Sequence, residues 1–77
     1  MGRDVLERDL ALAEKHVART SAHVQQQREI VARLELNSRD STLSRRILAT
    51  YEQMLQSHIR DRERLIMLLG TLPTRLG

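Results

Sequence analysis

The sequence predicts an all-α protein: an antiparallel two-helix hairpin that dimerises into a four-helix bundle. Three observations lead to this prediction. Apolar residues recur in a seven-residue rhythm in both halves of the chain, and one short polar stretch near Asn37 separates the halves. The chain also has no Phe or Trp and a single Tyr. An aliphatic composition suits seams between helices, whereas β-sandwiches and small barrels depend on aromatic and β-branched runs.

The first helix is predicted over about residues 3–36. One apolar line consists of Leu10, Val17, Val24 and Val31, and the alternate positions hold Leu6, Ala13, Thr20, Gln27 and Leu34. This spacing is a heptad seam. The residues between are mostly charged or amides, and pairs such as Glu29 and Arg33 are four apart, which stabilises a helix modestly.

A turn is predicted over residues 37–40. Asn37 tolerates the left-handed conformation that ends many helices, so we expect the first helix to stop at Leu36. Asp40 is the favoured N-cap of the next helix because its carboxylate can accept free amide hydrogens of the first turn; Ser41 and Thr42 are the weaker alternatives. A connector this short makes the two helices antiparallel.

The second helix is predicted over about residues 41–69. Its seam consists of Leu48, Leu55, Arg62 and Leu69, with Ser44, Tyr51, His58 and Leu65 at the alternate positions. Further apolar residues flank the seam: Ile47, Met54 and Leu68 on one side, Ile59 and Ile66 on the other. Gly70 is the expected C′ residue and Pro73 follows it, so residues 70–77 form a tail. The whole chain, 1–77, is one domain.

Two polar layers are expected in the seam between the helices. Pairing about the turn makes facing residue numbers sum to about 78, so Tyr51 faces Gln27 and His58 faces Thr20. A buried phenol needs a hydrogen-bond partner, which Gln27 would supply. Buried polar residues of this kind set the register of helix pairs.

Self-association is expected because two helices side by side bury each seam residue on one side only. The apolar run at 65–69 also points in nearly every direction around the helix. We therefore expect a homodimer or higher oligomer. Its interface is predicted to contain Leu6, Leu10, Leu55, Ile59, Leu65, Ile66, Leu68 and Leu69.

The charge does not indicate a strongly basic surface. Thirteen Lys and Arg residues against ten acids give a net charge of +3, without a basic cluster. Binding of nucleic acid or another acidic surface through the Arg-rich second helix is therefore an alternative function, not the leading one. The chain lacks Cys, and its longest apolar run is too short to span a bilayer. We expect a complete, soluble, cytoplasmic protein that does not bind membranes.

A metal site is the other alternative. Its candidate ligands are His16, His23, His58 and Asp61, a plausible donor set for a transition metal. Helical ligands usually lie three or four residues apart, and only His58 and Asp61 do so here. A structural polar layer is the favoured interpretation, so no metal or cofactor is expected. Without a nucleophile arrangement or a glycine-rich phosphate loop, we expect a protein that is not an enzyme.

Several segments together carry a family resemblance: Glu14-Lys-His-Val17, Gln27-Arg-Glu-Ile-Val-Ala-Arg-Leu-Glu35, Leu48-Ala-Thr-Tyr-Glu52 and His58-Ile-Arg-Asp-Arg62. The chain resembles a group of small uncharacterised helical-hairpin proteins from alphaproteobacteria, although their turns often contain Gly. The resemblance implies the fold and a bacterial accessory role, with no activity attached. The leading functional prediction is a non-enzymatic, homo-oligomeric helical interaction module that binds or regulates another protein.

Overall fold

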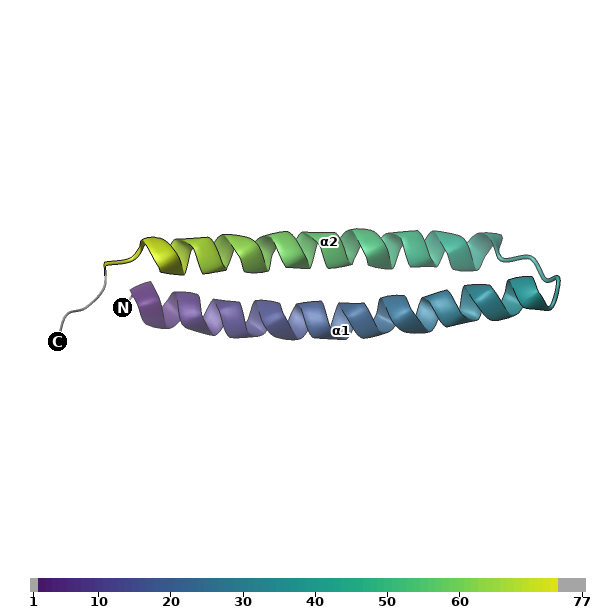
Figure 1. Cartoon of the computed structure of the whole chain (residues 1–77), viewed down its shortest axis with the longest axis horizontal. Helices are drawn as coiled ribbons and strands as arrows, with labels where there is room; N and C mark the ends of the chain where they lie inside the picture. The colour runs from purple at the N-terminus through teal and green to yellow at the C-terminus, as the bar shows by residue number, and fades with distance from the viewer. Residues whose placement is uncertain (1, 74–77) are drawn as a thin grey trace.

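Two long helices lie side by side and antiparallel in the computed structural model, which describes residues 2–73. Helix α1 (Gly2–Leu36) and helix α2 (Thr42–Thr71) are joined by a short turn at one end, and both chain termini lie at the other end (Figure 1). The molecule measures 63 × 14 × 14 Å. The predicted all-α hairpin is confirmed, with helix ends within two residues of their expected positions.

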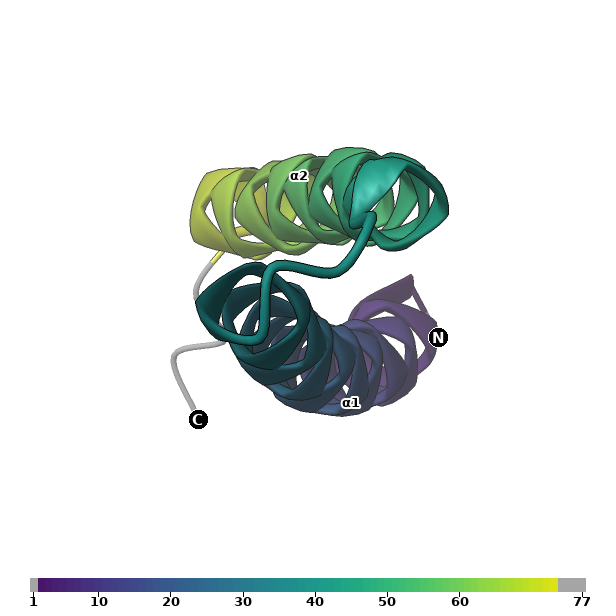
Figure 2. The same cartoon turned by 90° about the vertical axis from the view of Figure 1, so that its right-hand side faces the viewer.

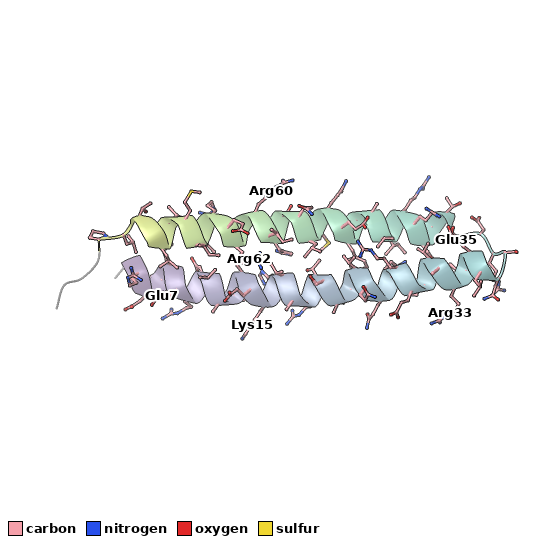
Figure 3. The ribbon with its side chains drawn as sticks, in the orientation of Figure 1. Glu7, Lys15, Arg33, Glu35, Arg60 and Arg62 are labelled. Atoms are coloured by element: carbon pink, nitrogen blue, oxygen red, sulfur yellow. The ribbon has the colours of Figure 1, made fainter. Side chains whose placement is uncertain are left out.

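The heptad seam forms the contact between the helices, as predicted. All nine seam positions of α1 and all eight of α2 are buried or half-buried. The buried apolar core is small: Ala13, Val24, Val31 and Leu65 have exposed fractions of 3–7%. Residues on the outer faces, such as Lys15 and Arg60, point away from the partner helix (Figure 3). The hairpin therefore has a single narrow line of contact.

Helix α1 ends at Leu36 as predicted, but the left-handed residue of the turn lies one position later than expected. Ser38, not Asn37, has the left-handed conformation, with φ of 55°. The amide of Arg39 donates to the carbonyl of Leu34 (2.7 Å), and the amide of Ser38 donates to that of Glu35 (3.1 Å), which is a Schellman cap. Asn37 keeps a helical bond, and its side chain Nδ2 also donates to the carbonyl of Arg33 (2.9 Å). Ser38 thus takes the strained position that we had assigned to Asn37.

The start of α2 divides the capping role between two residues. Ser41 is the N-cap by position, but its side chain makes no capping bond. The Asp40 carboxylate accepts hydrogen bonds from the Thr42 amide (3.0 Å) and the Thr42 hydroxyl (2.6 Å). These bonds hold the pKa of Asp40 below its ordinary value. The predicted N-cap was therefore wrong by one residue, although the carboxylate does accept an amide hydrogen of the first turn.

Helix α2 continues past Gly70, which the sequence had suggested as its C′ residue. No glycine in the described range has a positive φ, and the helix runs to Thr71. Leu72 is extended (φ −69°, ψ 143°), the conformation that Pro73 imposes on the residue before it. The proline ends the helix, so the predicted tail begins later; residues 74–77 lie outside the described part of the chain.

A cluster at the turn ties the end of α1 to the beginning of α2. The Glu35 carboxylate accepts hydrogen bonds from the guanidinium of Arg45, with Nε at 2.6 Å, and from the Ser41 hydroxyl at 3.0 Å. These hydrogen bonds hold the pKa of Glu35 below its usual value, and those from Arg45 have a larger effect than the one from Ser41. The carboxylate thus favours its ionised form in the folded protein.

Replacing Gly70 with Ala should stabilise the protein by about 0.5–1 kcal/mol, the difference in helix propensity between the two residues. A methyl group at Gly70 would meet no atom within 4 Å, so the substitution introduces no clash. Urea denaturation followed by circular dichroism measures the change. Destabilisation by Gly70→Ala would instead indicate a left-handed cap at this position.

The turn cluster should make stability depend on pH. A carboxyl with a lowered folded pKa contributes stability above its unfolded value, and this contribution is lost as the pH falls through the folded pKa. Glu35→Gln should therefore flatten the loss of stability between about pH 5 and pH 3. Denaturation midpoints across this range provide the measurement, with the exposed Glu29→Gln as the matched control. Identical pH profiles for the two variants would contradict the proposed role of the cluster.

Candidate interaction surface

The contact line between the helices leaves two open flanks, seen as the sides of the helix pair when viewed from the turn end (Figure 2). On one flank, ion pairs bridge the helices. Arg28 Nη2 lies 3.2 Å from Glu52 Oε2, and Arg45 pairs with Glu35. We call the side defined by these four residues the charged flank. Its ion pairs are each about half exposed, so they contribute little to stability individually.

The opposite flank lies on the other side of the seam from these ion pairs. Residues next to the seam positions line it. It carries Asp9, His16, His23 and Ile30 of α1, Ile47, Met54, Asp61 and Leu68 of α2, and the adjacent outer residues Val5, Leu12 and Leu43. The four residues of α1 recur every seven positions, as do the four of α2, which places each set along one line of its helix. We call this side the apolar flank.

Most of the exposed large apolar side chains gather on the apolar flank. Ten such residues are exposed in the described range, and seven of them lie there: Val5, Leu12, Ile30, Leu43, Ile47, Met54 and Leu68, with exposed fractions of 39–69%. The remaining three, Leu36, Ile66 and Met67, are elsewhere on the surface. Single exposed apolar residues are ordinary, but an aligned set marks an interaction surface.

The predicted oligomer interface is only partly available to a second chain. Leu65 is 3% exposed because α1 already covers it. Leu6, Leu10, Leu55, Ile59 and Leu69 are half-buried. Only Ile66 and Leu68 are largely exposed, at 46% and 39%. The sequence analysis did not identify Ile30 and Leu43 as interface residues. Ile30 continues the seven-residue line of His16 and His23, and because those two residues are polar, the line did not stand out as apolar.

The two predicted polar layers exist, but their contacts differ from those expected. Thr20 and Gln27 are buried, and Tyr51 and His58 are half-buried. Gln27 Nε2 donates to the carbonyl of Ser44 (3.0 Å), whereas the Tyr51 ring stacks on His23 with centroids 5.3 Å apart. Gln27 therefore does not supply the hydrogen bond to Tyr51 that the sequence suggested. Both ring residues of α2 contact a histidine at the edge of the seam.

The second ring pair is formed by His58 and His16. Their ring centroids are 5.0 Å apart. His16 belongs to the apolar flank, one helical turn from the Thr20 that we expected opposite His58. The ring of His58 therefore lies toward the apolar flank, as does that of Tyr51.

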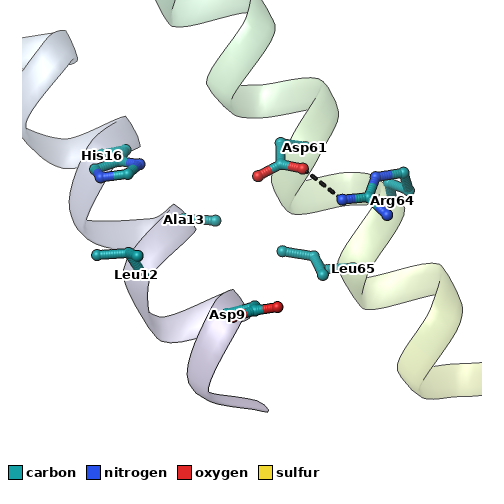
Figure 4. Close-up of a pocket in the computed structure, with 7 residues that line it drawn as sticks. All are labelled: Asp9, Leu12, Ala13, His16, Asp61, Arg64 and Leu65. Atoms are coloured by element: carbon teal, nitrogen blue, oxygen red, sulfur yellow. Dashed lines mark hydrogen bonds and ion pairs between the residues drawn. The ribbon is translucent and has the colours of Figure 1, made fainter. Parts of the chain in front are cut away.

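A shallow hollow of about 120 Å³ lies on the apolar flank near the open end of the hairpin. Asp9, Leu12, Ala13 and His16 line it from α1, and Asp61, Arg64 and Leu65 line it from α2 (Figure 4). Arg64 Nη2 donates to Asp61 Oδ1 (2.8 Å), so this carboxylate already has a cationic partner. Ala13 and Leu65 give the hollow an apolar base between polar groups.

The metal candidates do not converge on one point. His16 lies beside His58, but His23 is stacked on Tyr51. Across residues 2–73, no group of three or more His, Cys, Asp or Glu side chains is arranged to hold a metal ion. The structure therefore does not bring His16, His23, His58 and Asp61 together as one ligand set.

The arginines of α2 do not form a continuous basic stripe. Three of the five are paired with acids: Arg45 with Glu35, Arg62 with Glu63, and Arg64 with Asp61. The other two, Arg46 and Arg60, are separated by fourteen residues, about 21 Å along a helix. This spacing lacks the clustered charge of a typical nucleic-acid interface. Neither described helix has the length and apolar character needed to cross a membrane.

Comparison with known proteins gives no further guide to this surface. No family model, curated protein or solved structure matches the chain. The resemblance to alphaproteobacterial hairpin proteins stays a prediction.

The Gln27 contact provides a test of the observed polar layer. Gln27→Ala removes its hydrogen bond and leaves a cavity at an 8% exposed position, so we expect a loss of about 1–3 kcal/mol. Tyr51→Phe should change stability by much less, since Gln27 bonds to the Ser44 carbonyl and not to the phenol. Denaturant titration compares the two variants. A large loss in Tyr51→Phe would favour the original pairing.

Proposed function

We propose that the protein is a non-enzymatic interaction module that works by self-association, forming a four-helix bundle that binds or regulates another protein. The observation that carries this proposal is the surface left uncovered by a single chain. The hairpin exposes 6,245 Å², whereas a compact monomer of 8.9 kDa exposes about 4,800 Å². The excess, about 1,400 Å², is larger than the roughly 800 Å² per partner of a standard interface.

The elongated shape supports the same proposal. The radius of gyration is 17.8 Å, compared with about 11.5 Å for a compact domain of 77 residues. Each helix contacts only one other helix, so most of its circumference remains in water. Pairing of two hairpins gives each helix a second neighbour, which is how four-helix bundles bury a wider apolar face.

The exposed side chains supply the chemistry for association. Ile30, Ile47, Met54 and Leu68 lie in line along one flank. Their removal from water contributes about 25 cal/mol for each Å² of apolar area buried. The alternative functions lack an equivalent feature: the basic residues of α2 are dispersed, and the histidines are divided between two ring pairs.

Sedimentation equilibrium should show a dimer or larger oligomer at micromolar concentration. The melting temperature should rise with protein concentration because association stabilises the folded state by mass action. The same samples can be titrated with a mixed-sequence DNA duplex and single-stranded RNA, for which we expect no salt-dependent binding. A folded monomer with a concentration-independent melting temperature would refute the proposal.

A further inference from the structure

Building on the proposed self-association, we propose that a second copy of the chain docks on the apolar flank, with both turns at the same end of the assembly. In this arrangement α1 of each hairpin packs against α2 of the other. The twofold axis runs parallel to the long axis of the helices. This assigns the interface to one side of the hairpin and fixes the orientation of the two copies.

The side chains that each flank would bury on dimerisation indicate which flank the second copy covers. The charged flank carries two bridging ion pairs, Arg28–Glu52 and Glu35–Arg45. Removing these from water incurs a desolvation penalty that their mutual attraction often does not recover. The apolar flank instead offers seven large apolar side chains that are 39–69% exposed, and its Arg64–Asp61 ion pair lies within α2 near the open end. Burial of the apolar flank is therefore the favoured mode.

The orientation follows from the order of residues along the apolar flank. The interhelical ion pairs join residues whose numbers sum to 80, and the ring pairs join residues whose numbers sum to 74. The midpoint of these sums is 77. At that register Ile30 is level with Ile47, His23 with Met54, His16 with Asp61, and Asp9 with Leu68. The flank is thus aliphatic near the turn and polar near its centre.

With both turns at the same end, each level of the flank meets the same level of the second copy, with α1 opposite α2. Ile30 then faces the partner's Ile47, and Asp61 faces the partner's His16. These contacts pair an aliphatic side chain with an aliphatic one near the turn and a carboxylate with an imidazole near the centre, while Asp9 faces the partner's Leu68 at the open end. Complementary polar contacts of this kind help to fix the register of an interface.

The opposite orientation gives poorer contacts. If the turns lay at opposite ends, each helix would face the same helix of the second copy. Asp9 would face the partner's Ile30, and His16 would face the partner's His23. The same register sets Asp61 against the partner's Met54, so both carboxylates of each copy would lose hydration against apolar side chains, whereas with the turns at the same end only Asp9 does. The residue order therefore favours turns at the same end.

A matched pair of variants tests the choice of flank. Ile47 and Ile66 have similar exposure, 39% and 46%, but lie on opposite sides of α2. Ile47→Asp places two carboxylates in the proposed interface and should raise the dimer dissociation constant by on the order of 100-fold. Ile66→Asp should change it by less than about threefold. The reverse pattern would overturn the choice of flank, while the continued presence of a dimer would leave the proposed function intact.

Two controls cover the case in which the Ile47→Asp variant does not fold. Circular dichroism monitors the helix content of each variant, and Ile47→Ala provides a milder change that should weaken the dimer without adding charge. A weaker concentration dependence of the melting temperature in Ile47→Ala than in Ile66→Ala supports the inference. Equal dependence in the two alanine variants would contradict it.

The orientation is tested by a distance between the two turns. The chain has no Cys, so Arg39→Cys allows a single spin label on the exposed turn of an otherwise unmodified surface. Pulsed electron paramagnetic resonance should give a distance well below the 63 Å length of the hairpin. A distance close to that length would show turns at opposite ends and overturn the orientation. Absence of any dimer would refute the proposed function itself.

Discussion

A hairpin of two helices has one line of contact, and this constraint governs the rest of the structure. Each helix can bury only the stripe that faces its neighbour, so the apolar core consists of Ala13, Val24, Val31 and Leu65. Thr20 and Gln27 are also buried, and the remaining seam residues are partly exposed. The stability of the fold therefore depends on how well the side chains of this single seam pack and form hydrogen bonds, and on what covers its two sides.

Polar residues within the seam show how a thin core is organised. Gln27 is 8% exposed and donates a hydrogen bond to the Ser44 carbonyl of the other helix, which fixes the two helices relative to each other in the half nearer the turn. No side-chain nitrogen or oxygen of this kind is left buried without a partner in the described range. Farther from the turn, the stacked ring of Tyr51 and the neighbouring ring of His58 repeat this function at the edge of the seam. Register is thus specified by particular contacts along the helices.

The sequence predicted the seam well because a seven-residue period directly reports which residues share a helix face. It was less informative at the turn, where Asn37 and Ser38 are adjacent residues that can each adopt the left-handed conformation, and at Gly70, where Pro73 determined the end of the helix. Gln27 also does not supply the hydrogen bond to Tyr51 that the sequence suggested. Heptad position locates a residue along the helix, but the direction of a long side chain depends on its neighbours.

The candidate surface was the hardest feature to predict. The line of Ile47, Met54 and Leu68 was visible in the sequence, but its counterpart on α1 was not, because two histidines precede Ile30 at the same spacing. Periodicity alone also does not say which of the two flanks is closed by interhelical ion pairs. That distinction required the positions of Arg28, Glu52, Glu35 and Arg45 across the seam.

Folding of the hairpin and its proposed association depend on neighbouring and partly shared residues. The surface that a second copy would cover lies directly beside the seam, so residues such as His16 and Asp61 belong both to the edge of the hairpin and to the proposed interface. A substitution there would change the stability of the hairpin and the affinity between copies together. Because only folded hairpins present an aligned flank, association would select the folded state. The register within the chain would then set the register between chains, since both depend on the same pairing of α1 with α2.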